Sequence, residues 1–292
     1  MMTRERFSII VVPDTQNVIT SQPEMLVNTC EWIVDQAETL NIKMVLHVGD
    51  VVNDGAETDW HWDNHHAAFD KIDEANIPMM IAIGNHDYDN LLQVDRGSVA
   101  FNTHCGMYRY QNKQWFGGVF ENNKTENMYA TLMISGEPYI FMSLEFAPRD
   151  EVIEWANDIL RKHHDHKAMI VTHSFLYING ERTQPGANHH PHSYKGTMDG
   201  NDGEALWEKC ISLHENVMAV YSGHHVGGNV SHRYDLGRAN NTVLQSFQNW
   251  QQTENGGAGR IRVITYGTDG TVQHAVFNPQ TNKYETEPGY TF

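Results

Sequence analysis

The sequence predicts an α/β fold with a largely parallel sheet, because three buried-strand patterns in its first third alternate with two helical patterns. The strand patterns are FSIIVV (7–12), KMVLHVGD (43–50) and IPMMIAIGNHD (77–87). The helical patterns occupy 23–40 and 58–76. Strands that are buried on both faces and joined through helices are typical of parallel sheets with right-handed connections.

Each of these elements has its own local signal. The run at 7–12 is apolar and rich in β-branched residues, as in a strand covered on both sides. Pro23 and Glu24 suit the first turn of a helix, and the periodic pattern continues from them to residue 40. In parallel sheets, functional side chains gather beyond the carboxyl ends of the strands. The residues that follow each strand are therefore the candidates for a functional site.

The rest of the chain predicts further strands and helices around one long loop. The expected short strands are 115–123, 127–135, 138–146, 166–174 and 216–225, and the expected helices are 149–164 and 203–214. Residues 176–202 form a polar stretch rich in turn residues, and loops of that length are often functional. Strand patterns with turns between them continue from residue 228. Since no internal repeat or clear linker interrupts the sequence, we expect a single domain over 1–292.

Composition restricts the class of partner. The net charge of −17 argues against broad binding to nucleic acid or to an anionic membrane. No stretch approaches the roughly 18 apolar residues of a membrane span. The three cysteines are widely spaced and fit a reducing compartment. Because the N-terminus lacks a separate apolar segment and a cleavage site, we expect no signal peptide and a cytoplasmic location.

Five predicted strands deliver polar side chains of the metal-binding type into the loops that follow them. In chain order these residues are Asp14 and Gln16, Asp50, Asn85 and His86, His173, and His224 and His225. Carboxylate, amide and imidazole groups bind divalent ions through oxygen and nitrogen. If the backbone stays extended over 14–16, Asp14 and Gln16 project to the same side. Two ions about 3.5–4 Å apart can clamp a phosphate group and activate a water molecule.

The order of these motifs resembles the calcineurin-like metallophosphoesterase superfamily, in a branch with DxQ in the first motif. The motifs are PDTQ (13–16), GDVVN (49–53), GNHD (84–87), His173 after a strand, and GH (223–224). The resemblance implies a four-layer α/β/β/α sandwich with two mixed sheets. It also implies a phosphatase or phosphodiesterase that acts on a small phosphate ester with two divalent ions, from among manganese, iron and zinc.

The resemblance also implies a role for each metal-binding residue. Asp14 would bind the first ion, and Asp50 would bridge the two ions. The second ion would be bound by Asn85, His173 and His224.

Two neighbouring residues would serve the substrate instead of the metal. A hydroxide bridging the ions would attack phosphorus, and His86 would assist the leaving group. Asp87 would orient His86 and favour its protonated form.

Two positions depart from the family pattern at the first ion. Gln16 stands where a histidine is usual, and Val226 stands where a second histidine is usual. Gln16 would offer an amide oxygen at most, while Val226 offers no ligand. His225 is a ligand candidate if the loop shifts register. We therefore expect a first site that is weaker and richer in oxygen than the second, and that favours manganese or iron over zinc.

Two other functions remain open on the sequence alone. A binding or regulatory protein that keeps the fold with an impaired first metal site would explain Gln16 and Val226. The retention of Asp50, Asn85 and His86 argues for an enzyme. A nuclease would use the same chemistry, but no basic stripe is visible for a polynucleotide backbone.

Overall fold

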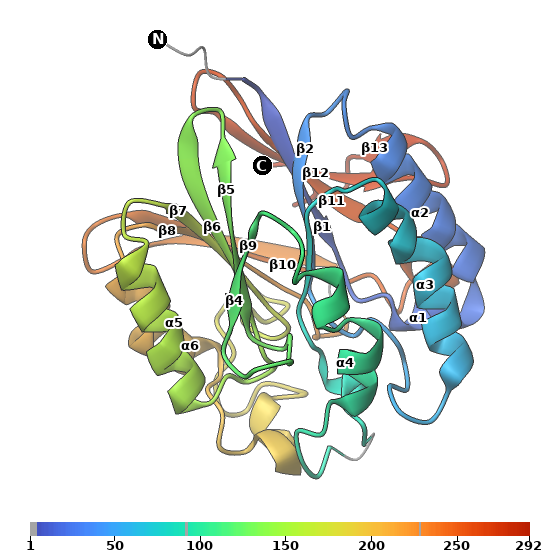
Figure 1. The fold of residues 1–292 in the computed structure, drawn as a ribbon, viewed down its shortest axis with the longest axis horizontal. Helices are drawn as coiled ribbons and strands as arrows, with labels where there is room; N and C mark the ends of the chain where they lie inside the picture. The colour runs from blue at the N-terminus through green and yellow to red at the C-terminus, as the bar shows by residue number, and fades with distance from the viewer. Residues whose placement is uncertain (1–4, 91–92, 228) are drawn as a thin grey trace.

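The computed structural model describes residues 5–90, 93–227 and 229–292, and two β-sheets packed face to face form its centre (Figure 1). Among the described residues, the first sheet has six strands in the order β13-β12-β11-β1-β2-β3. Their bounds are β1 Phe7–Val12, β2 Ile42–His47, β3 Met79–Ile81, β11 Ile261–Tyr266, β12 Val272–Asn278 and β13 Lys283–Glu285. Strands β1, β2 and β3 are parallel, whereas β11 runs antiparallel to β1, so the sheet is mixed.

The second sheet is also mixed. In the described part of the chain it has seven strands in the order β4-β5-β6-β7-β8-β10-β9. Their bounds are β4 Phe116–Val119, β5 Met128–Ile134, β6 Glu137–Leu144, β7 Lys167–Thr172, β8 Val217–Ser222, β9 Val230–Leu236 and β10 Thr242–Gln248. The central strands β6, β7, β8 and β10 are parallel, and the outer pairs are antiparallel.

Helices cover the outer face of each sheet. Their bounds are α1 Gln16–Ser21, α2 Pro23–Asp35, α3 Asp59–Glu74, α4 Val99–His104, α5 Asp150–Lys162 and α6 Gly203–Lys209. Helices α1, α2 and α3 lie on the outer side of the first sheet, and α5 and α6 lie on the outer side of the second (Figure 1). Among the residues described, no helix is both long enough and apolar enough to span a bilayer.

The packing explains why β1 reads as an uninterrupted apolar run. Ile9 and Val11 point into the core between the sheets, where they meet Val171 of β7. Ile10 and Val12 point the other way, into the core beneath the helices. Because side chains alternate across a strand, both faces of β1 must be apolar. The four-layer α/β/β/α sandwich with two mixed sheets is confirmed.

The condition under which Asp14 and Gln16 would project to the same side is not met. The chain is not extended across 14–16, because Thr15 has φ −103° and ψ −4° and Gln16 begins helix α1. The backbone N–H groups of Thr15 and Gln16 both donate to the carbonyl oxygen of Asp50, at 3.0 Å each. This contact between the loops after β1 and β2 determines the direction in which the chain leaves β1.

Candidate metal centre

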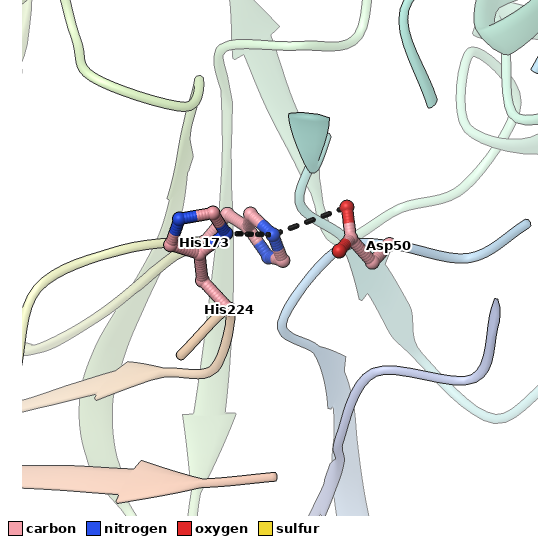
Figure 2. A group of neighbouring side chains, drawn as sticks. All are labelled: Asp50, His173 and His224. Carbon is pink, nitrogen blue, oxygen red and sulfur yellow. Dashed lines mark hydrogen bonds and ion pairs between the residues drawn. The ribbon is translucent and has the colours of Figure 1, made fainter. Parts of the chain in front are cut away.

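Three buried side chains from three strand ends meet at one point. Asp50 follows β2, His173 follows β7 and His224 follows β8, and their ligand atoms all lie within 4.8 Å of one another. His173 Nε2 is 3.1 Å from Asp50 Oδ1 and 3.2 Å from His224 Nδ1 (Figure 2). Asn85 Oδ1 lies 3.2 Å from the same nitrogen. Both sheets therefore contribute to a single cluster.

Backbone carbonyl groups determine which nitrogen of each imidazole faces the cluster. His173 Nδ1 lies 2.9 Å from Val48 O, and His224 Nε2 lies 2.8 Å from His189 O. A carbonyl oxygen only accepts, so both of these nitrogens must carry hydrogen. His173 Nε2 and His224 Nδ1 then face each other with the lone pairs that bind metal ions.

The electrostatics of the cluster favour a cation. Burial alone would lower the pKa of His173, but the carboxylates of Asp50 and Asp14 raise it to about 9. Burial would raise the pKa of Asp50, but His173 and its other histidine neighbours hold it below its usual range. Burial and the neighbouring imidazoles lower the pKa of His224, which stays neutral. A positive charge at His173 Nε2 is thus surrounded by acceptors.

This donor set fits a divalent ion. Once His173 Nε2 gives up its proton, four acceptor atoms converge: a carboxylate oxygen, an amide oxygen and two imidazole nitrogens. Mixed oxygen and nitrogen sets of this kind hold zinc, manganese and iron. An ion bound here would satisfy all four atoms at once, in place of the proton on His173.

The backbone around the cluster is tightly constrained. Asp50 has φ 51° and His224 has φ 74°, and such left-handed values are uncommon outside glycine and often occur at functional sites. A Cβ at Gly84 would lie 2.2 Å from both the backbone nitrogen and Oδ1 of Asp50. The glycine of the GNHD motif therefore allows the loops after β2 and β3 to touch.

We expect Gly84→Ala to destabilise the fold and to weaken metal binding together. Atoms at 2.2 Å overlap, so the loop after β3 must move away from Asp50, and overpacking of this kind costs about 1–3 kcal/mol. Chemical denaturation and metal titration of the variant measure the two effects. Unchanged stability and unchanged affinity would show that the two loops do not touch.

His86 lies at the cluster, but its partner is not the one expected. Its ring Nδ1 donates to the carbonyl oxygen of Asn53 at 2.8 Å, and its backbone N–H donates to Asp50 Oδ1 at 3.0 Å. Asp87 instead accepts from the backbone N–H of Val52 at 3.1 Å and of Gly84 at 2.8 Å. The expectation that Asp87 orients His86 is therefore wrong in this structure. Asn53 O orients the ring, and Asp87 holds the two loops together.

A cavity opens beside the cluster and encloses about 420 Å³ of empty space, part of it open solvent. Its wall is formed by Gln16, Asp50, Asn85, His86, His189, Tyr194, His224, Val226, Gln251 and Gln252. His189 and Tyr194 belong to the long loop 176–202, so this loop contributes to the cavity wall. Burial and the nearby Asp50 raise the pKa of the Tyr194 phenol to about 12, so it remains a hydrogen-bond donor.

Comparison with known proteins identifies the family. The pattern of the calcineurin-like phosphoesterases matches residues 7–228, most of the chain. This chain belongs to the calcineurin-like phosphoesterase family.

Individual proteins are similar to this chain over most of its length. The chain is 27% identical to the Bacillus subtilis (strain 168) protein named "Uncharacterized protein YvnB", with 97% of this chain covered. It spans only 21% of the length of that relative. A purple acid phosphatase from yellow lupin seeds has a similar fold, with TM-score 0.59 and 15% identity, over 99% of this chain and 53% of that one. A dimetal phosphatase from Danio rerio gives TM-score 0.54 and 11% identity, over 92% and 95%.

The residues expected at the first ion have different surroundings. Asp14 is buried, and its carboxylate accepts from the backbone N–H of His224 at 3.0 and 3.2 Å. Burial and the nearby Asp50 raise the pKa of Asp14, although His173 opposes this shift. Gln16 and Val226 both line the cavity, and Val226 has no group that binds metal.

His225 faces away from the cluster of Asp50, His173 and His224. Its Nε2 lies 3.1 Å from Ser174 Oγ, and its ring packs edge-on against Tyr177. It does not belong to the group formed by Asp50, His173 and His224. The register shift that would bring His225 to the metal is therefore not present in this structure.

Two residues near the site were not expected from the sequence. Asn249 Nδ2 donates to Asp14 Oδ2 at 2.8 Å, and Gln251 Oε1 accepts from Gln16 Nε2 at 2.8 Å. Both follow β10, a strand of the C-terminal segment. The only signal was that FQNWQ (247–251) places polar residues directly after a strand, as the five expected segments do.

Proposed function

We propose that this chain is a metal-dependent hydrolase of small phosphoric esters, either a phosphatase or a phosphodiesterase, and that 1–292 acts as one domain. The observation that carries the proposal is the convergence of Asp50, Asn85, His173 and His224 on one point. A cavity lined by His86 opens beside that point. The cluster supplies an ion site, and the cavity supplies room for an ester.

The ions and the side chains would have different roles in the reaction. Two divalent ions, from among manganese, iron and zinc, would neutralise phosphoryl oxygens and activate the attacking water. The side chains would orient the ester and donate a proton to the leaving group. His86 is the residue for that proton, because Asn53 O occupies its Nδ1 and leaves Nε2 as its remaining nitrogen.

The size and charge of the molecule favour a small ester over a polynucleotide. The enclosed space is small, since the cavity's about 420 Å³ of empty volume includes open solvent, and this suits a small ester. The net charge of −17 opposes a long anionic chain. If the chain were a nuclease, its rate of hydrolysis should fall steeply as the salt concentration rises, because polynucleotide binding depends on salt.

We propose that Tyr194 donates a hydrogen bond to the ester, and we expect Tyr194→Phe to raise KM about threefold to tenfold. That range is the effect of one neutral hydrogen bond, and the ring itself remains to pack against Phe146. Steady-state kinetics with a nitrophenyl ester measure the change. The exposed Tyr234 provides the matched control, Tyr234→Phe. An unchanged KM would show that the Tyr194 hydroxyl does not contact substrate.

The direct test of the function is hydrolysis of 4-nitrophenyl phosphate and bis(4-nitrophenyl) phosphate. We expect a chelator to abolish turnover, and manganese, iron or zinc to restore it. The ratio of the two rates would distinguish a phosphatase from a phosphodiesterase. If the stripped protein binds these ions but hydrolyses neither ester, the alternative of a binding or regulatory protein is favoured. Gln16 and Val226 are the residues that support that alternative.

A further inference from the structure

A chain of side-chain amides connects Asp14 to Gln16. Asn249 Nδ2 donates to Asp14 Oδ2 at 2.8 Å and to Gln251 Oε1 at 3.3 Å. Gln16 Nε2 donates to the same Gln251 oxygen at 2.8 Å. The backbone N–H of Gln251 donates to Asn249 Oδ1 at 2.9 Å. These four residues join the loop after β1 to the loop after β10.

The carboxylate of Asp14 sets the direction of every amide in this chain. Both Asp14 oxygens accept from the backbone N–H of His224, so they act as acceptors and Asn249 presents its NH₂ group to Asp14. The bond from the Gln251 backbone to Asn249 Oδ1 requires the same orientation. Gln251 must then turn its oxygen toward that NH₂ group, and Gln16 must turn its own NH₂ group toward Gln251. The hydrogen-bond network thus determines which atom of the Gln16 amide is the oxygen and which is the nitrogen.

This orientation leaves one buried oxygen unsatisfied. Gln16 is 3% exposed, and no residue in 5–90, 93–227 or 229–292 hydrogen-bonds to its Oε1. A buried carbonyl oxygen without a partner is unfavourable, so it indicates an atom that the protein alone does not provide. Gln16 forms part of the cavity wall together with Asp50 and His224.

We propose that Asn249 and Gln251 position Gln16 Oε1 as a ligand of the first ion, so that this ion is held beside Asp14 and Asp50 through oxygen atoms alone. The inference rests on the proposed function, since it concerns the same centre. The two sites then differ in kind. The first is an oxygen site suited to manganese or magnesium, and the other contains two imidazoles and suits zinc.

Metal titration of the stripped protein tests this difference. With zinc, we expect one tight equivalent per chain. With manganese, we expect two equivalents, the second at least about tenfold weaker. Electron paramagnetic resonance of the fully loaded manganese form should show two coupled ions. A single equivalent at saturating manganese, or two equally tight zinc equivalents, would overturn the inference.

Substitutions at Gln16 and Gln251 test whether these amides hold the more weakly bound ion. Gln16→Leu should remove the weaker manganese equivalent and leave the tighter one. Gln251→Leu frees the Gln16 amide to rotate and should weaken the same equivalent, whereas Gln251→Glu keeps the acceptor and should retain it. Gln252→Leu, at the exposed neighbour in the cavity wall, is the matched control and should keep both equivalents. Loss of the tighter ion in Gln16→Leu, or an unchanged weaker ion in both leucine variants, would contradict the assignment.

A double variant that restores the two histidines tests the same inference through a gain of zinc binding. Gln16→His combined with Val226→His supplies two imidazoles, and we expect the tight zinc stoichiometry to rise from one to two. Thermal unfolding checks that each variant is folded. If the wild type hydrolyses esters with a single bound ion, the proposed function stands and this inference falls. If the stripped protein binds no ion, both fall.

Discussion

His173→Ala is expected to remove the tightly bound ion and the turnover together. His173 Nε2 lies at the middle of the cluster, within 3.2 Å of Asp50, Asn85 and His224. Loss even of the outer hydrogen-bond partners of a metal ligand weakens binding by about 10–100-fold. Loss of the ligand itself should weaken zinc binding by at least about 100-fold. Elemental analysis of the dialysed protein and ester hydrolysis measure the two effects.

His225→Ala is the informative comparison for that experiment. His225 is adjacent to a ligand and is also buried, but its ring faces Ser174 and Tyr177. We expect this variant to keep its metal, and denaturant unfolding corrects for any loss of stability in either protein. If His225→Ala loses the ion while His173→Ala keeps it, the cluster described here is not the metal centre.

His86→Ala is expected to keep its metal and to lose turnover by about 10²- to 10⁴-fold, the usual range for removal of a general acid or base. The loss should be larger for alkyl phosphate esters than for nitrophenyl esters, because nitrophenolate leaves without help from an acid. The two effects separate because the His86 ring contacts Asn53 O and not the four ligand atoms. Turnover with both kinds of ester, together with metal content, is the measurement.

A surface histidine controls for the effect of removing an imidazole. His164 is exposed and lies between α5 and the start of β7, whereas His173 follows the other end of β7, so His164→Ala should change neither quantity. Equal losses with alkyl and nitrophenyl esters would argue that His86 acts on binding and not on the leaving group. A loss of metal in His86→Ala would place His86 in the ion site itself.

The strand ends were predictable because they carry a strong signal. A strand buried on both faces must be apolar throughout, so the polar residue that ends it is conspicuous. Asp50, His173 and His224 were found in this way, and parallel strands bring such residues to the same edge. The two mixed sheets were expected from the resemblance, because residue patterns alone do not show how distant strands pair.

The partners within the site were less predictable, because backbone groups made many of them. Asp87 stands next to His86 in sequence, yet its acceptors are used by the N–H groups of Val52 and Gly84. The partner of the His86 ring is a carbonyl of Asn53, and any residue at position 53 would supply one. Adjacency in sequence therefore suggested a contact between the Asp87 and His86 side chains. In the structure each of these side chains is instead hydrogen-bonded to the backbone.

The amide chain was hidden for a different reason. Asn249 and Gln251 lie 235 residues from Asp14 and Gln16, and amides are ordinary loop residues without a characteristic spacing. The short helix α1 also went unrecognised, and it places Gln16 differently from an extended chain. Only the fold shows that these four residues meet.

An anomalous difference map from crystals of the zinc-loaded protein tests the central claim most directly. The claim is that Asp50, Asn85, His173 and His224 hold a catalytic ion beside His86. We predict one strong peak bounded by those four side chains, with each ligand atom about 2.0–2.2 Å from it. A zinc peak elsewhere, or no peak at this cluster in a protein that hydrolyses phosphate esters, would contradict the account.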